Sequence, residues 1–119
     1  MNNNNTNTIN VSRFEKYCLI KIGGQVVSLS TSIRLKEILN DLIHKEKFYQ
    51  IILDLSELKF IESSLIGVIV DAYKLLIMIN GKMNIIVKAK SVYERFEISQ
   101  LDKLLRIYDN LEDAKKPFV

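Results

Sequence analysis

The chain has 119 residues, of which 48% are hydrophobic and 26% are charged, and this balance predicts a single globular domain. The net charge of +3 is small, and the lysines are spread along the chain rather than gathered in the basic stripe of a nucleic-acid-binding protein. No apolar stretch is long enough to cross a bilayer, and the N-terminus lacks the apolar centre of a secretion signal. We therefore expect a cytoplasmic protein with no nucleic-acid partner and no membrane partner.

The N-terminal part predicts a tail followed by a hairpin. Residues 1–8 are rich in asparagine and predict a flexible tail, which leaves residues 9–119 as the domain. Residues 9–14 and 17–22 are short runs of β-forming residues, as in a hairpin. Cys18 lies in the second run, where a buried core residue is expected, and as the only cysteine it cannot form an internal disulfide.

The middle of the chain predicts a strand, a helix and a second strand. The apolar run 50–55 is typical of a buried strand, and residues 63–79 have helical character up to the stop signal Asn80-Gly81. Residues 83–87 form another buried-type run. Two strands joined by a helix of this length should be parallel, with a right-handed crossover.

Three further helices and one short strand complete the expected order. The first helix is capped by Ser30 or Thr31, has its apolar positions within residues 33–43 and ends near residues 45–47. The others are a helix to Ile98 with a capping box of Ser91 and Glu94, a strand within 104–108, and a helix over 110–116 capped by Asn110. The order β-β-α-β-α-β-α predicts an α/β fold with a mixed sheet of four or five strands and helices packed against it. The opening hairpin argues against a doubly wound nucleotide-binding fold, which should begin β-α-β.

Few residues could form a catalytic centre. His44 is the only histidine, and beside Lys45 near the end of a helix it is expected to be solvated. Gly23-Gly24 lacks the following lysine and hydroxyl residue of a phosphate-binding loop. One histidine and one cysteine are too few strong ligands for a zinc site. We expect no enzyme activity, no cofactor and no metal.

The strongest functional pattern lies in residues 51–69. A buried strand leads through a short loop into Glu62-Ser63-Ser64-Leu65-Ile66-Gly67, an acid and two serines at the start of a helix. This stretch resembles the STAS domain of bacterial anti-sigma-factor antagonists, in which the strand is followed by Asp-Ser-Ser/Thr-Gly-Leu-Gly. Residues 20–27 resemble the family's second strand and its Gly-Glu-Leu-Asp segment, and the order of elements matches from residue 9 to 115.

The resemblance implies a switch. A serine-kinase-type anti-sigma factor would bind the protein and phosphorylate Ser63, with Ser64 as second choice, and the phosphate would switch binding off. A serine phosphatase is the further partner that the resemblance implies. The partner-binding residues would be Glu62, Ser63, Ser64, Leu65, Gly24, Gln25 and Val27.

Two positions depart from the family pattern. Val27 stands where the family has an acid near the phosphoacceptor, and Leu65 stands where it has a glycine. We expect a bulky Leu65 to narrow the space that a kinase could use. The alternative function is a STAS interaction module that is never phosphorylated, in a signalling scaffold or a transporter accessory complex. The residues alone also allow Ser63 and Ser64 merely to cap the helix.

The end of the same helix is apolar on every side. It reads Leu75-Leu76-Ile77-Met78-Ile79, and such a helix end needs cover all round. The expected core face consists of Ile66, Ile69, Val70, Tyr73 and Leu76 or Ile77. Two explanations are open. Either flanking segments cover the helix end, or Leu75, Ile77 and Met78 form an apolar patch for self-association or a larger assembly.

Overall fold

A computed structural model describes residues 7–119; residues 1–6 of the expected tail lie outside the described part. The strands are β1 (Ile9–Arg13), β2 (Cys18–Ile22), β3 (Gln50–Asp54), β4 (Lys82–Ile86) and β5 (Arg106–Tyr108). The helices are α1 (Leu29–His44), α2 (Ser63–Met78), α3 (Lys90–Ile98) and α4 (Leu111–Lys115), with short 3-10 turns η1 (Leu101–Lys103) and η2 (Lys116–Phe118). The predicted order of elements is confirmed.

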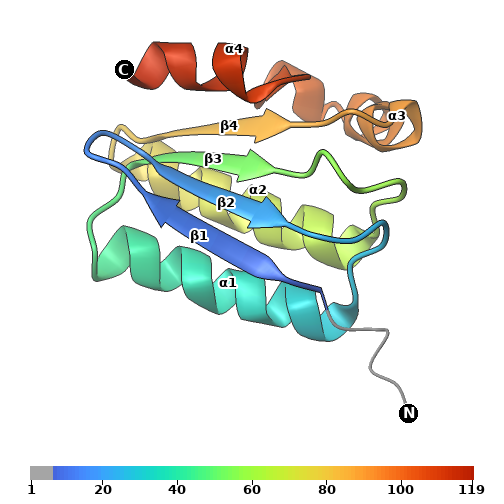
Figure 1. Ribbon diagram of the computed structural model, residues 1–119, viewed down its shortest axis with the longest axis horizontal. Helices are drawn as coiled ribbons and strands as arrows, with labels where there is room; N and C mark the ends of the chain where they lie inside the picture. Colours follow the sequence, from blue (N-terminus) through green and yellow to red (C-terminus); the bar gives the residue numbers. More distant parts are fainter. Residues whose placement is uncertain (1–6) are drawn as a thin grey trace.

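The strands form one mixed sheet in the order β1-β2-β3-β4-β5 (Figure 1). Strand β1 pairs antiparallel with β2 as the predicted hairpin, and the remaining neighbours are parallel. The expected parallel pairing of the two central strands is confirmed, with Leu53 opposite Ile85. Because each crossover returns the chain to the same end of the sheet, the carboxyl ends of β2, β3 and β4 lie together.

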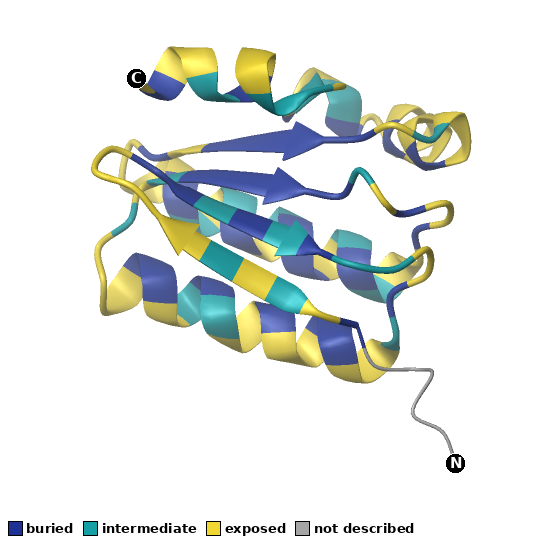
Figure 2. Ribbon diagram, viewed as in Figure 1, coloured by how far each residue is buried: buried dark blue, intermediate teal, exposed yellow. Residues whose placement is uncertain are grey.

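Two apolar layers enclose the sheet. Helices α1 and α2 pack side by side on one face, and α4 packs on the other face against β3, β4 and β5. This arrangement buries β3 and β4 almost completely, as Figure 2 shows, and explains their nearly continuous apolar sequences. The one buried polar side chain of β4, Asn84, donates a hydrogen bond of 2.8 Å to the carbonyl of Ala114 in α4.

Cys18 lies in the core, as expected. Its side chain is fully buried, and burial raises the pKa of the thiol to about 11. The thiol therefore stays protonated at neutral pH. Among residues 7–119 no helix combines the length and the apolar character needed to cross a membrane.

Several helix starts differ from the predicted ones. Helix α1 is capped by Ser28, whose hydroxyl oxygen accepts from the Thr31 N–H, so neither Ser30 nor Thr31 is the cap. The predicted capping box of α3 is wrong, since the cap is Ala89 and the Ser91 hydroxyl bonds to another loop. Asn110 is confirmed as the cap of α4, because its side chain accepts from the Asp113 N–H at 2.8 Å.

The domain begins before the expected boundary at residue 9. Asn7 is buried, and its backbone N–H donates to the hydroxyl of Thr31 in α1. Asn7 and Thr8 therefore belong to the folded domain and not to the tail. The expectation of flexibility for residues 1–6 lies outside the described residues.

The buried face of α2 is rotated from the expected face. Its buried residues are Leu65, Val68, Ile69, Ala72 and Leu76. The expected core residues Ile66, Val70 and Tyr73 are only half-buried, and Ile77 is exposed. Eleven of the 16 residues of this helix are apolar, so the hydrophobic period has little contrast from which a buried face could be predicted.

Candidate functional site

Three loops meet where the parallel strands end. They are residues 23–28 after β2, residues 55–62 after β3 and residues 87–89 after β4, and α2 begins beside them (right-hand side of Figure 1). We call these loops, together with the first turn of α2, the serine pole. Ligands commonly bind outside the carboxyl ends of the strands in open α/β sheets, and this favours the serine pole as a functional site.

Hydrogen bonds join the first two loops to each other and the second loop to the start of α3. The backbone N–H groups of Lys59 and Phe60 both donate to the Gln25 carbonyl, at 2.8 and 3.4 Å. The Ser91 hydroxyl, at the start of α3, donates to the Lys59 carbonyl. Within the 55–62 loop, buried Leu58 and Ile61 add apolar anchors. The loop that leads to Ser63 is therefore held in place before any partner binds.

Asn7 fastens the first of these loops from the N-terminal side. Its side-chain amide donates to the carbonyls of Gly23 and Val26, both at 2.9 Å, and its side-chain oxygen accepts from the Ser28 N–H at 3.1 Å. Gly24, in the centre of the loop, has a φ of +109°, which an L side chain rarely adopts. The side chain of Asn7 thus holds the 23–28 loop in shape through three hydrogen bonds to its backbone.

An acid lies at the edge of the serine pole although Val27 replaces the family's acid. The Glu57 carboxylate accepts from the Gly24 N–H at 3.1 Å and pairs with Lys21 at 3.4 Å. The Gly24 N–H, and next to it Lys21, lower the pKa of Glu57 below its ordinary value. Because the pKa is lowered, the contribution of this carboxylate to stability is present above the unfolded-state pKa and is lost as the pH falls through the folded-state pKa.

Ser63 lies exposed in the first turn of α2. The cap residue of this helix is Glu62, whose side chain makes no capping hydrogen bond. The N–H groups of Leu65 and Ile66 both donate to the Glu62 carbonyl at 3.1 Å, so those of Ser63 and Ser64 precede the first bond of the helix. Neither serine hydroxyl makes a hydrogen bond to any residue of 7–119, which argues against a capping function. Ser64 is half-buried and therefore less accessible than Ser63.

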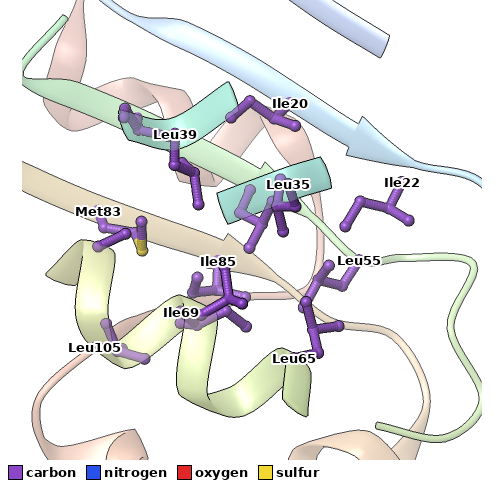
Figure 3. Packing of buried hydrophobic residues seen from close by; sticks show 14 of the residues in the cluster. Ile20, Ile22, Leu35, Leu39, Leu55, Leu65, Ile69, Met83, Ile85 and Leu105 are labelled. Atoms are coloured by element: carbon purple, nitrogen blue, oxygen red, sulfur yellow. The ribbon is translucent and has the colours of Figure 1, made fainter. Parts of the chain in front are cut away.

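Two expected partner contacts are corrected, because their side chains belong to the core. Leu65 is 1% exposed and lies close to Leu55 beneath the helix (Figure 3). It therefore does not narrow the surface around Ser63. Val27 is also buried, on the side of the loop that faces the core. Both departures from the family pattern thus add apolar packing under the serine pole, whereas Gly24 and Gln25 remain at its surface.

The surface next to Ser63 is open on the side of Gly67. Residues four apart share a helix face, so Gly67 lies one turn from Ser63 on the same face. A Cβ atom built on Gly67 would meet nothing within 4 Å. The surface over this first turn is therefore open, and glycine leaves it uncovered. The fold does not require glycine at position 67, because a larger side chain would meet no neighbouring atom at its Cβ.

Two apolar residues of the serine pole were missed by sequence reasoning. Phe60 is 63% exposed, and its N–H is bonded to the carbonyl of Gln25, directly before Val26, which is also exposed. Large apolar side chains on an anchored loop suit contact with a protein partner. A phenylalanine in a polar loop was the available signal, but exposure depends on the neighbouring loop and cannot be read from local sequence.

The remaining expected site residues lie elsewhere. Ile77 and Met78 are exposed and Leu75 is half-buried, all at the opposite end of α2. His44 is exposed at the last turn of α1. Within residues 7–119 no group of three or more histidine, cysteine, aspartate or glutamate side chains could hold a metal ion.

Comparisons with known proteins agree with this geometry. The STAS domain family model matches residues 8–114. A relative from Paenibacillus polymyxa named anti-sigma F factor antagonist is 29% identical over 96 residues, which make up 81% of each chain. An anti-sigma factor antagonist from Mycobacterium paratuberculosis has a TM-score of 0.83 at 17% identity, with 99% of this chain and 98% of that chain covered.

A second solved structure adds a phosphorylated protein of the same fold. The Bacillus cell fate determinant SpoIIAA in its phosphorylated form has a TM-score of 0.75 at 15% identity, and the likeness covers 92% of this chain and 98% of that chain. At such low identities the two structures show the shared fold. The family model, in contrast, matches nearly all of the sequence from Thr8 to Ala114, and the chain belongs to the STAS domain family.

Proposed function

We propose that this protein is an anti-sigma-factor antagonist whose serine pole binds a serine-kinase-type anti-sigma factor, and that phosphorylation of Ser63 switches this binding off. The anti-sigma factor then gives up its sigma factor while the unphosphorylated antagonist is bound. The observation that carries the proposal is the exposed, unbonded Ser63 hydroxyl at the start of α2, on a pre-anchored loop. The name of the Paenibacillus polymyxa relative supports the same type of regulator.

The surroundings of Ser63 suit a phosphoacceptor better than those of Ser64. Ser63 is exposed and faces the open surface left by Gly67, whereas Ser64 is half-buried. The free N–H groups of the first helical turn and the helix dipole both stabilise a phosphate placed there. The adjacent Glu62 carboxylate opposes it. The start of α2 thus tolerates the phosphate without unfolding. The phosphate changes the affinity for the partner and not the fold.

Phosphate would release the partner through desolvation. It adds about −1.5 to −2 charges at pH 7 to a pole that also exposes the apolar side chains of Phe60 and Val26. A contact that removes this group from water without supplying a positive partner is strongly unfavourable. The same surface therefore binds in one state and is excluded from binding in the other.

The test uses the serine-kinase-type anti-sigma factor of the same organism, with ATP and intact-mass measurement. Wild-type protein and the control Ser64→Ala should each gain one phosphate, and Ser63→Ala should gain none while still binding the kinase. Ser63→Asp should bind the kinase about tenfold more weakly or worse, a loss of about 1.4 kcal/mol, because it places a charge in the contact.

Two results would contradict the proposal. Phosphate found on Ser64 would move the acceptor by one residue. No phosphate on either serine, with the kinase active on another antagonist, would favour the alternative of an interaction module that is not phosphorylated. In that case Val27 and Leu65 would be the sequence features of a STAS domain that is not phosphorylated and has additional apolar residues in its core.

A further inference from the structure

The C-terminal end of α2 exposes a cluster of large apolar side chains. Ile77, Met78 and Ile79 are 53%, 81% and 40% exposed, and half-buried Leu75 lies one turn before them. We call these four residues the apolar pole. Helix α4 lies on the other face of the sheet, and no segment of residues 7–119 covers the pole. Of the two explanations that the sequence left open, cover by flanking segments does not hold within residues 7–119.

A hollow lies on each side of this helix end. The first, of about 260 Å³, lies between the ends of α1 and α2; its lining consists of Ile43, His44, Lys47, Tyr49, Leu75, Met78 and Ile79. The second, of about 200 Å³, lies between α2 and the starts of β4 and β5, where Tyr73, Ile77 and Leu104 supply its apolar wall. A cavity of about 150 Å³ accepts a benzene molecule, so each hollow can take a leucine or phenylalanine side chain.

The charged side chains that line the two hollows are all cationic. Lys47 lines the first hollow, Lys82 and Arg106 line the second, and no carboxylate among the described residues lines either. None of these three groups, nor Lys74 one turn before Met78, forms an ion pair with a residue of 7–119. The nearest carboxylate on α2 belongs to Asp71, a further turn back. The carbonyls of Leu76 and Ile77 are already bonded, which limits the negative potential of the helix end.

We propose that the apolar pole binds an acidic amphipathic helix of a partner protein. Apolar side chains spaced three and four residues apart on that helix enter the two hollows, and its carboxylates face Lys47, Lys74, Lys82 and Arg106. A second copy of this chain fits poorly, because a two-fold contact through the pole would bring the same cations together. A lipid surface would leave the two hollows unused.

The proposed helix does not compete with the anti-sigma factor. Helix α2 has 16 residues and is therefore about 24 Å long, with Ser63 at one end and Met78 at the other. A partner of standard interface size at one pole leaves the other pole accessible. The apolar pole would thus tether the antagonist to an assembly while its serine pole continues to exchange partners.

The test titrates isotope-labelled protein with a synthetic helix of about five turns that carries leucines along one face and glutamates elsewhere. Amide chemical shifts should change at 77–79 and 82 and stay constant at Ser63. Met78→Ser should weaken binding about tenfold, and Lys74→Glu combined with Lys82→Glu should weaken it at least as much. The matched control is Ile98→Ser, because Ile98 is 79% exposed on α3 and Met78 is 81% exposed. All variants should keep the thermal midpoint of the wild type.

Four outcomes would overturn the proposal. The first is the absence of chemical-shift changes at the apolar pole, and the second is equally tight binding of the same helix with lysines in place of glutamates. The third is a dimer in sedimentation that Met78→Ser abolishes. The fourth is binding to anionic phosphatidylserine vesicles that Met78→Ser abolishes. None of these bears on Ser63, because phosphorylation is measured separately by intact mass.

Discussion

The two ends of α2 are built in opposite ways. At the N-terminal end backbone hydrogen bonds join the loops after β2 and β3, the apolar side chain of Leu65 points inwards, and the hydroxyl of Ser63 faces the solvent on the same pole as exposed Phe60. At the C-terminal end no comparable loop closes over the helix in the described residues, and Ile77 and Met78 point outwards. The first end is pre-organised around a modifiable hydroxyl, and the second offers uncovered apolar area. A single helix thus joins the surface for which we propose regulation by phosphorylation to a surface with uncovered apolar area.

The largest effect should come from removing the core side chain of the serine pole. Leu65→Ala creates a cavity beneath Ser63 and should lower the free energy of unfolding by about 2–5 kcal/mol in urea denaturation. Met78→Ala, at the other end of the same helix, should change it by less than about 0.5 kcal/mol, because that side chain is already in water. Equal losses at both positions would mean that the C-terminal end of α2 is covered in solution.

A smaller loss should follow from releasing the first loop. Asn7→Ala leaves the carbonyls of Gly23 and Val26 and the Ser28 N–H without their bonds, and should cost about 1–3 kcal/mol in the same urea assay. Amide hydrogen exchange should rise in residues 23–28 and stay unchanged at 77–79. Asn10→Ala, on the exposed face of β1, is the control and should have little effect. Unchanged exchange in the loop would show that Asn7 does not hold it.

The smallest changes in stability should come from replacing the two glycines near the ends of α2, and the two replacements should have opposite signs. Gly67→Ala meets open space and should stabilise the protein by about 0.5–1 kcal/mol, because alanine restricts the unfolded chain. Gly81→Ala should destabilise it, because the new Cβ would lie 2.6 Å from the Tyr49 carbonyl oxygen. The larger Gly67→Leu should also slow phosphorylation of Ser63 while the fold stays intact. Phosphorylation at the wild-type rate would show that the kinase does not use this surface.

The secondary structure and strand pairing of this protein can be predicted from the sequence better than its loop contacts and its exposed surfaces. The order of elements along the chain and the parallel pair follow from local patterns, and α2 begins at Ser63, one of the two starts that were expected. The loop clamp by Asn7 could not be predicted, because it joins residues 16 to 21 positions apart. The orientation of Leu65 was missed for a related reason. In a helix with 11 apolar residues among 16, tertiary packing and not periodicity decides which side is buried.

The burial of Cys18 makes the protein unusually convenient for spectroscopy. Thiolates and not thiols react with maleimides and spin labels, and the pKa of about 11 keeps this only cysteine of the chain unreactive near neutral pH. A cysteine introduced at Gln25 or at Ile79 would therefore be labelled alone, in the folded protein and without first replacing Cys18. Probes at the two ends of α2 could then report independently on which partner has arrived.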